Sequence, residues 1–200
     1  MRVKTEARRE AILKVASEVF LETGYQRASM AEISSRVGGS KATLYSYFPS
    51  KEALFVEVTL MHGQRNITQA LSALQPDTPD LAQTLQSYGE SVMELICSAD
   101  AINAVRIVIA ESGNSDIGRN FYASGPKQGD EALAAFLALE VEAGRLRRVD
   151  PSLLSTHFTS LLDGPVLLPL LLGVRQETSG EEIKQLVADA VSAFLAAYGT

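Results

Sequence analysis

The sequence predicts an all-α protein with a small three-helix domain at residues 1–55 and a larger helical domain at residues 56–200. Three observations support this division. Apolar residues recur at helical spacing along almost the whole chain, and no stretch alternates apolar with polar residues well enough to predict a strand. Serine caps and glycine stops divide the N-terminal part into short helices. Further along the chain the predicted helices are longer and more apolar.

The first helix is predicted at about residues 5–22, because an apolar stripe follows one side and Gly24 offers a stop. A second, short helix is expected to begin after Ser29, whose hydroxyl can cap it while Glu32 reaches back in a capping box. Gly38 and Gly39 end this helix. The apolar stripe of the first helix consists of Ile12, Val15, Ala16, Val19 and Phe20.

A third helix is predicted between Ser40, which can cap it, and Pro49, which closes it. Ser50 can cap a longer fourth helix that starts at Lys51 and continues to a break at residues 76–80. The apolar face of this fourth helix consists of Leu54, Phe55, Val58 and Met61. Later helices are expected at about residues 81–97, 101–112, 116–124, 128–143, 151–173 and 181–198.

The last two helices carry the clearest start signals of the larger domain. Asp150 followed by Pro151 is a cap and a first helical residue, and Ser179 with Glu182 makes a second capping box. These signals predict a final pair of helices that follow one another closely in the chain.

Composition predicts a folded globular chain without a membrane span. Hydrophobic residues make up 46% and charged residues 21%, which argues against disorder. The longest apolar run, residues 164–174, contains two prolines and is too short for the roughly 20 residues that cross a bilayer. The charged N-terminus does not resemble a secretory signal, so we expect a cytoplasmic protein. With one cysteine, Cys97, and two separated histidines, neither a disulfide nor an ordinary zinc site is expected, and no cofactor is predicted.

Charge is distributed unevenly along the chain. The net charge of -6 argues at first against a nucleic-acid partner, since phosphates require a basic surface. Residues 1–51, however, hold nine Lys and Arg against five Asp and Glu, and the remainder holds nine against nineteen. A basic N-terminal segment on an acidic body is the distribution needed if only one end of the chain docks on a polyanion.

The turn at residues 38–39 joins two short helices within this basic segment, as in a helix-turn-helix motif, which places its second helix in the major groove of DNA. Leu44 and Phe48 lie one turn apart and are expected in the core. Lys41, Ala42 and Thr43 would then face base edges, where an ammonium can donate to guanine and a methyl group can touch thymine.

Three further residues are predicted to reach phosphates. Tyr45 and Tyr47 are placed to do so from the same helix. Lys51 lies in the first turn of the next helix, where free N–H groups and the helix dipole favour an anion. The alternatives are that the tyrosines are core residues and that Lys41 and Lys51 are solvated surface lysines.

The stretch from Ser29 to Phe55, with GGSKATLYSYFPSKEALF at its centre, resembles the DNA-binding domain of the TetR family of transcriptional regulators. The resemblance covers about the first 55 residues. One departure is Gly39, since the family commonly has Val there, and its absence removes a core anchor of the turn. Residues 106–111, 121–126 and the helix start at 150–151 resemble the AefR-like branch of the family. The resemblance implies base contacts from Lys41, Ala42 and Thr43, and phosphate contacts from Ser29, Tyr45, Tyr47 and Lys51.

The resemblance also implies that the larger domain dimerises and often encloses a small apolar or amphipathic ligand. The apolar surface of the last two helices is wider than one neighbouring helix covers, which predicts a homodimer whose two pairs form a four-helix bundle. The alternative is that this surface is entirely intramolecular core. The expected interface residues are Leu161, Leu162, Val187, Val191 and Phe194.

Candidates for a ligand pocket are the large or polar residues on otherwise apolar helices of the larger domain. Packing is the alternative for the aromatic and Met residues, and a hydrogen-bonded interior position is the alternative for the histidine. The arginine shares a stripe with Ile102, so we expect it to bind a carboxylate or a helix end, and only secondarily an anionic ligand. The candidates are Tyr88, Met93, Arg106, Phe121, Tyr122, His157 and Phe158.

These features together predict a homodimeric, ligand-responsive transcriptional regulator, most simply a repressor. Two reader domains about 34 Å apart would fit successive major grooves of a palindromic operator in double-stranded DNA. An activator, or a regulator without a ligand, fits the same sequence. A small helical enzyme fits less well, because the chain has no zinc pattern, phosphate loop, nucleophile elbow or histidine with an obvious neighbouring carboxylate.

Overall fold

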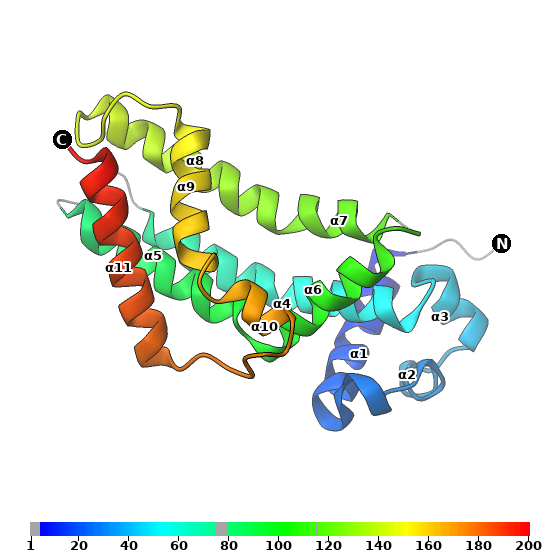
Figure 1. Cartoon of the computed structure of the whole chain (residues 1–200). Coiled ribbons are helices and arrows are strands. Elements are labelled where there is room, and N and C mark those ends of the chain that lie inside the picture. The colour runs from blue at the N-terminus through cyan, green and yellow to red at the C-terminus, as the bar shows by residue number, and fades with distance from the viewer. Residues whose placement is uncertain (1–4, 75–79, 115) are drawn as a thin grey trace.

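A computed structural model describes residues 5–74, 80–114 and 116–200 and confirms the all-α prediction. Figure 1 shows α1, α2 and α3 gathered at one end of the molecule, while α5, α8, α9 and α11 lie towards the other. The helices of the described residues are α1 (Glu6–Arg27), α2 (Met30–Val37), α3 (Lys41–Tyr47), α4 (Lys51–Ala73), α5 (Leu81–Ile96), α6 (Ala99–Glu111), α7 (Ile117–Ser124), α8 (Pro126–Glu142), α9 (Pro151–Asp163), α10 (Leu167–Leu171) and α11 (Gly180–Tyr198).

Helix α4 connects the two ends of the molecule. Its 23 residues span about 35 Å at 1.5 Å per residue. We call α1 to α3 and the first two turns of α4 the head, and the remainder of the chain the body. The predicted loop at residues 76–80 falls almost wholly on residues 75–79, which lie outside the described residues.

Helix starts are determined by local side-chain caps. In eight helices, the residue before the first turn accepts a hydrogen bond from the backbone N–H three positions further along. At the two predicted capping boxes the serine half is present, but the glutamate is engaged elsewhere: Glu32 with Arg36, and Glu182 with Arg175. The capping residues are Thr5, Ser29, Ser40, Ser50, Asp80, Ser98, Asp150 and Ser179.

Two predicted boundaries are wrong because of a proline, and the first helix extends to Arg27 instead of ending near residue 22. The helix expected at 151–173 is divided into α9 and α10, because Pro165 has no N–H to continue the ladder beyond Gly164. Helix α8 begins at Pro126 rather than near residue 128, since proline is well suited to the first helical position.

The head has its own apolar core, built from the predicted faces of α1 and α4. Ile12, Ala16, Val19 and Phe20 are buried and Val15 is half-buried, as predicted, and the α1 backbone leaves helical geometry at Gly24 with φ of +75°. On α4 the inner face is buried, while the predicted fourth member, Met61, is exposed. The first helix of the chain therefore packs as its sequence pattern indicates.

Helix α6 joins the head to the body. Ala104 and Val108 of α6 are buried in the head core, although they lie far along the chain from it. On its other side, the Arg106 guanidinium donates to the carbonyls of Leu171 at 2.9 Å and Leu170 at 2.7 Å, at the end of α10. This confirms the expectation that Arg106 binds a helix end.

The body core lies between α5, α8, α9 and α11. Phe158 of α9 and Phe194 of α11 meet edge to face, with centroids 5.2 Å apart. Gly89 of α5 allows α11 to approach closely, since a Cβ there would lie 2.6 Å from Val187 Cγ1. No helix of the described part of the chain is both long enough and apolar enough to span a bilayer.

Candidate nucleic-acid interface

The turn between α2 and α3 has the geometry of a glycine-terminated helix. Gly38 is left-handed, with φ 71° and ψ 58°, a conformation that favours glycine. Its N–H donates to the Ser35 carbonyl at 3.2 Å, and the Gly39 N–H donates to the Ser34 carbonyl at 3.2 Å. The Ser34 hydroxyl also donates to the Gly39 carbonyl at 2.8 Å. These bonds fix the direction in which α3 leaves the turn.

Gly39 departs from the family pattern, and the space beside it is filled by the side chain of Arg8 from α1. An added Cβ at Gly39 would lie only 2.7 Å from Arg8 Nη2, and that same group donates to the Gly38 carbonyl at 3.1 Å. The expected core anchor is therefore replaced by a polar contact between α1 and the turn. A valine at this position would require the Arg8 side chain to move.

The start of α3 presents the predicted base-contacting residues to solvent. Lys41 and Ala42 are exposed, and Thr43 is half-buried with its hydroxyl 2.9 Å from that of Ser40. Behind them, Leu44 and Phe48 are buried, as predicted. Helix α3 is thus anchored by its apolar side, and its polar N-terminal edge is accessible.

The two tyrosines of α3 differ in their surroundings. Tyr45 is 48% exposed. Tyr47 is half-buried, and its hydroxyl accepts a hydrogen bond from the Thr5 backbone N–H at 3.0 Å, which ties the start of α1 to α3. The alternative interpretation as a core residue does not describe Tyr45, whereas Tyr47 packs partly buried against the head core.

Lys51 has partners that the sequence did not reveal. Its ammonium donates to the carbonyls of Tyr25 at 2.9 Å and Ala28 at 3.3 Å, at the end of α1, and lies 4.3 Å from the centroid of the Tyr25 ring. A cation at a helix C-terminus is favourable. Lys51 therefore joins the start of α4 to the end of α1, and it lies near Ser29, the exposed cap of α2.

Two other arginines of the head form ion pairs within it. Arg9 reaches Glu57 at 2.6 Å, and Arg36 reaches Glu22 at 2.7 Å and Glu32 at 2.8 Å. Lys41 has no ion-pair partner within the described ranges. Of these cations, Lys41 is the one that lies on α3, and its charge is exposed to solvent.

The structure does not bring the seven candidate ligand residues of the body together in one pocket. Tyr88, Met93 and Phe158 lie in the body core, and burial raises the pKa of Tyr88 to about 12. The other four are at least partly accessible: Arg106 on α6, Phe121 and Tyr122 on α7, and His157 on α9. The ring of His157 pairs with the Tyr198 hydroxyl, which agrees with the hydrogen-bonded alternative.

Four of the five expected interface residues are also core residues of a single chain. Leu162, Val187, Val191 and Phe194 are each at most 5% exposed, because α5 and α9 cover the inner face of α11. They have no surface left to offer a second copy. Leu161, at 38% exposed, is the exception.

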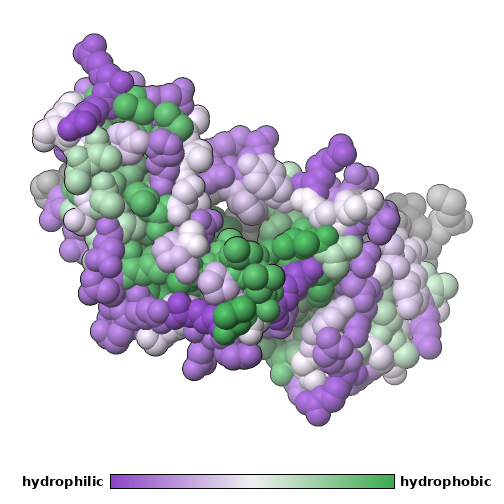
Figure 2. Space-filling view, viewed as in Figure 1, coloured by the Kyte–Doolittle hydropathy of each residue, from purple (hydrophilic) through white to green (hydrophobic). Residues whose placement is uncertain are grey.

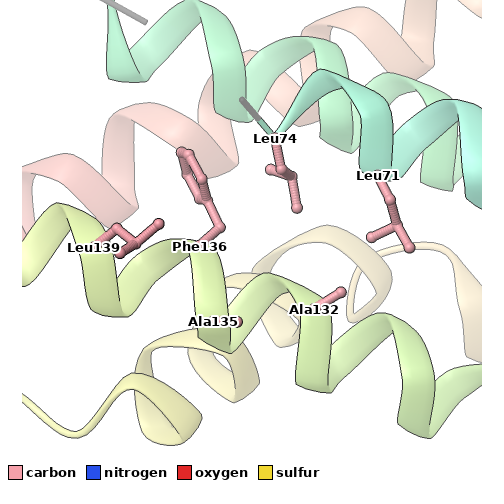
Figure 3. Close-up of a pocket in the computed structure, with 6 residues that line it drawn as sticks. All are labelled: Leu71, Leu74, Ala132, Ala135, Phe136 and Leu139. Atoms are coloured by element: carbon pink, nitrogen blue, oxygen red, sulfur yellow. The ribbon is translucent and has the colours of Figure 1, made fainter. Parts of the chain in front are cut away.

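Neither of two cavities in the described part of the structure is lined by any of the seven candidates. One, of about 300 Å³, is an apolar groove between the end of α4 and α8 (Figure 3). The other, of about 470 Å³, lies between α1, α4 and the α5–α6 corner, and we call it the junction cavity. The groove of Figure 3 is lined by Leu71, Leu74, Ala132, Ala135, Phe136 and Leu139.

Two family descriptions match the chain. Residues 12–58 match the family of bacterial regulatory proteins named after TetR. Residues 83–200, more than half of the chain, match the C-terminal domain of AefR-like transcriptional repressors. The matched families and the relatives below are transcriptional regulators, not enzymes.

Solved structures resemble this one over nearly its whole length. A putative TetR-family transcriptional regulator from Mesorhizobium loti superposes with a TM-score of 0.82 at 24% identity, and the alignment covers 100% of both chains. The flavonoid-responsive regulator FrrA superposes with a TM-score of 0.67 at 31% identity, covering 98% of each chain.

The curated relatives match this chain over only part of their length. The HTH-type transcriptional activator FasR of Mycolicibacterium smegmatis is 37% identical over 95 residues, which are 48% of this chain and 43% of FasR. The chain thus matches less than half the length of such relatives.

Proposed function

The chain belongs to the TetR family of DNA-binding transcriptional regulators, and from that premise we propose that it is a homodimeric repressor of a palindromic operator, released by a small ligand. The accessible N-terminal edge of α3 is the observation that carries the proposal. It is anchored from behind by Leu44 and Phe48 and directs Lys41 to solvent. A helix that reads DNA must be anchored through its apolar side while its polar side stays accessible to the major groove.

We assign specificity and affinity to different residues of the head. Lys41, Ala42 and Thr43 would contact base edges in the major groove. The phosphate contacts would come from the rim of α2 to α4, which carries a cap hydroxyl, two tyrosine hydroxyls and an ammonium. These phosphate-contacting residues are Ser29, Tyr45, Tyr47 and Lys51.

A dimer would form through the outer faces of α9 and α11 rather than through their buried faces. Leu153 and Leu161 of α9 are 45% and 38% exposed, and α9 has no charged residue before Asp163 at its end. On α11, the exposed Ala188 and Ser192 would allow a close approach of the partner. Interface centres are poor in charged residues, and stable interfaces bury about 1,200–2,000 Å² in total.

Further exposed apolar residues lie on α10 and directly after it. Figure 2 shows hydrophobic residues concentrated over the middle of the visible face, where α10 lies. Leu168 and Leu172 of this segment are exposed, the latter at 69%. Exposed apolar residues gathered in this way indicate an interaction site, and a second copy is the simplest occupant in a family of dimers.

The effector would bind in the body. The relative FrrA is described as flavonoid-responsive, so a planar aromatic effector is the first class to test. Of the seven candidate residues, Arg106, Phe121, Tyr122 and His157 are accessible to a ligand in the present conformation. Tyr88, Met93 and Phe158 would be reached only if the body core opened.

Helix α6 would transmit a conformational change from the effector site to the head. It holds α10 through Arg106 and contributes Ala104 and Val108 to the head core. A ligand that prefers a conformation with a different head separation lowers operator affinity by its differential affinity for the two forms, typically 1–3 kcal/mol. Since the regulator acts on the chromosome, we place it in the cytoplasm.

An activator remains the second candidate, because FasR, an activator, matches part of the chain. The AefR-like match over residues 83–200 is to repressors and favours repression. The position of the operator separates the two: overlap with a promoter indicates a repressor, and a site upstream of it indicates an activator.

Selection of genomic DNA fragments with the purified protein tests the proposal. We expect enrichment of a palindrome from a promoter region and a dimer by sedimentation at micromolar concentration. Leu161→Glu should give monomers. Leu139 is an exposed leucine of α8 outside the proposed interface, so the control variant Leu139→Glu should remain dimeric. A strictly monomeric wild type, or failure to enrich any sequence, would refute it.

A further inference from the structure

The junction cavity lies where the head meets the body. Its walls come from both parts: α1 and the start of α4 in the head, and the middle of α4, the start of α6 and Leu95 of α5 in the body. At about 470 Å³ it falls within the range of roughly 300–1,000 Å³ that small-molecule sites occupy. A molecule bound there would contact both parts at once.

One wall of the cavity is aromatic. Phe20, Tyr25 and Phe55 pack against one another, with centroids 4.9–6.2 Å apart. Phe20 and Phe55 are buried, Tyr25 is half-buried, and the apolar wall continues to Leu21 at the rim, which is 71% exposed. This wall fits a planar aromatic ring.

A polar part of the lining comes from the first turns of α6. Asp100 and Asn103 line the cavity here, and Asp100 is the one lining residue that is a carboxylate. Several other polar groups here have partners: the Ser17 hydroxyl is 2.7 Å from His62 Nε2, and the Thr59 hydroxyl donates to the Phe55 carbonyl at 3.0 Å. Asp100 is exposed, so its carboxylate can accept hydrogen bonds from a ligand.

Tyr25 of the aromatic wall contacts both an acidic and a basic side chain. Burial, the hydrogen bond to Glu52 at 2.7 Å and the charges of Glu52 and Glu111 together raise the pKa of Tyr25 well above its usual range. The Lys51 ammonium lies 4.3 Å from the centroid of the Tyr25 ring and donates to the carbonyls of Tyr25 and Ala28. The preference for a cationic ligand rests on Asp100, the one carboxylate among the residues that line the cavity.

We propose that the junction cavity binds a small planar aromatic molecule that carries a protonated amine. The ring would lie against Phe20, Tyr25 and Phe55, and the ammonium would pair with Asp100. This site is separate from the effector site proposed in the body, since it shares none of the seven candidate residues. Its occupant would connect α1 to α6 and restrict movement of the head.

Fluorescence titration of the full-length protein with 9-aminoacridine, without DNA, tests this site. The probe is a planar aromatic cation, and acridine-9-carboxylate is the anionic counterpart with the same ring. We expect saturable binding of one 9-aminoacridine per chain at micromolar concentration, and at least about ten-fold weaker binding of the carboxylate.

Two variants locate the site, each with a matched control. Ala101→Leu fills the cavity from α6 and should weaken 9-aminoacridine binding at least about ten-fold, whereas Ala110→Leu, on an exposed position of the same helix, should not. Asp100→Asn should weaken it about three- to five-fold and reduce the preference over the carboxylate, whereas Asp189→Asn on α11 should not.

Asp100 is exposed, so misfolding does not explain a loss of binding in Asp100→Asn. This variant therefore checks the result obtained with Ala101→Leu. The proposal is overturned if the wild type shows no saturable binding, if Ala101→Leu binds as tightly as the wild type, or if Asp100→Asn keeps the full charge preference. None of these results would affect the assignment of the DNA interface or of the dimer.

Discussion

Replacing Gly89 by alanine tests whether the inner face of α11 is core rather than interface. Alanine is normally the better helix residue, by about 1 kcal/mol. At Gly89 of α5, however, the new Cβ would lie 2.6 Å from Val187 Cγ1 and 3.4 Å from Leu162 Cδ2. A valine in a helix has essentially one χ1 rotamer and cannot turn away, so α5 and α11 must separate.

The expected change in the free energy of unfolding is the balance of two effects, the gain in helix propensity and the clash with Val187. Overpacking of a closed core costs about 1–3 kcal/mol, which exceeds the gain in helix propensity. We therefore expect Gly89→Ala to lower the free energy of unfolding by about 1–2 kcal/mol, measured by urea denaturation at fixed protein concentration. Gly129→Ala on α8, where an added Cβ meets nothing within 4 Å, is the matched control and should stabilise the protein by up to about 1 kcal/mol.

A double-mutant cycle identifies the contact responsible. Val187→Ala removes the methyl group that Gly89→Ala would strike and should itself cost about 2 kcal/mol, because Val187 is buried. In the Val187→Ala background, Gly89→Ala should be neutral or stabilising, which gives a coupling of about 1–2 kcal/mol. If Gly89→Ala is as stabilising as Gly129→Ala, or if the two changes are additive, the packing described for α5 and α11 is incorrect.

Three further changes test other parts of the structure. Lys51→Ala should flatten the slope of log affinity against log salt by about one unit, measured by DNA titration at several salt concentrations, whereas Lys184→Ala on α11 should leave it unchanged. Arg106→Leu removes two bonds to the end of α10, so amide exchange in residues 167–172 should accelerate about ten-fold while α11 is unaffected. Burial and the charge of Asp130 raise the pKa of Asp163, so its ionised form opposes folding. Asp163→Asn should raise the urea midpoint at pH 7, and the difference should vanish below the ordinary aspartate pKa near 3.8.

Local signals were sufficient to predict the starts of α2, α3, α4, α9 and α11. A cap such as Ser40 and its N–H partner at Thr43 are separated by three residues, so the contact is visible in the sequence. The same applies to the anchors Leu44 and Phe48, which lie one turn apart. The division of the predicted helix 151–173 into α9 and α10 could have been predicted from Pro165, whose missing N–H is a local property.

Contacts between distant segments could not be predicted from one sequence. The apolar stripe of α11 was wide, but its width did not reveal that α5 and α9 of the same chain cover Val187 and Phe194. Likewise Lys51 bonds to the end of α1, 26 residues earlier, and no periodicity relates the two segments. The junction cavity arises in the same way, since α1 and α6 approach only in the folded chain.

Hydroxyl-radical footprinting on the operator that the protein selects tests the central claim most directly. Two reader heads held by one dimer should protect two patches on the same face of the duplex, centred about 10–10.5 base pairs apart or a multiple of that spacing. Lys41→Ala should weaken both patches equally, since each copy contributes one exposed α3 edge. A single protected patch, or footprints that Lys41→Ala leaves unchanged, would contradict the assignment of α3 as the reading helix of a dimer.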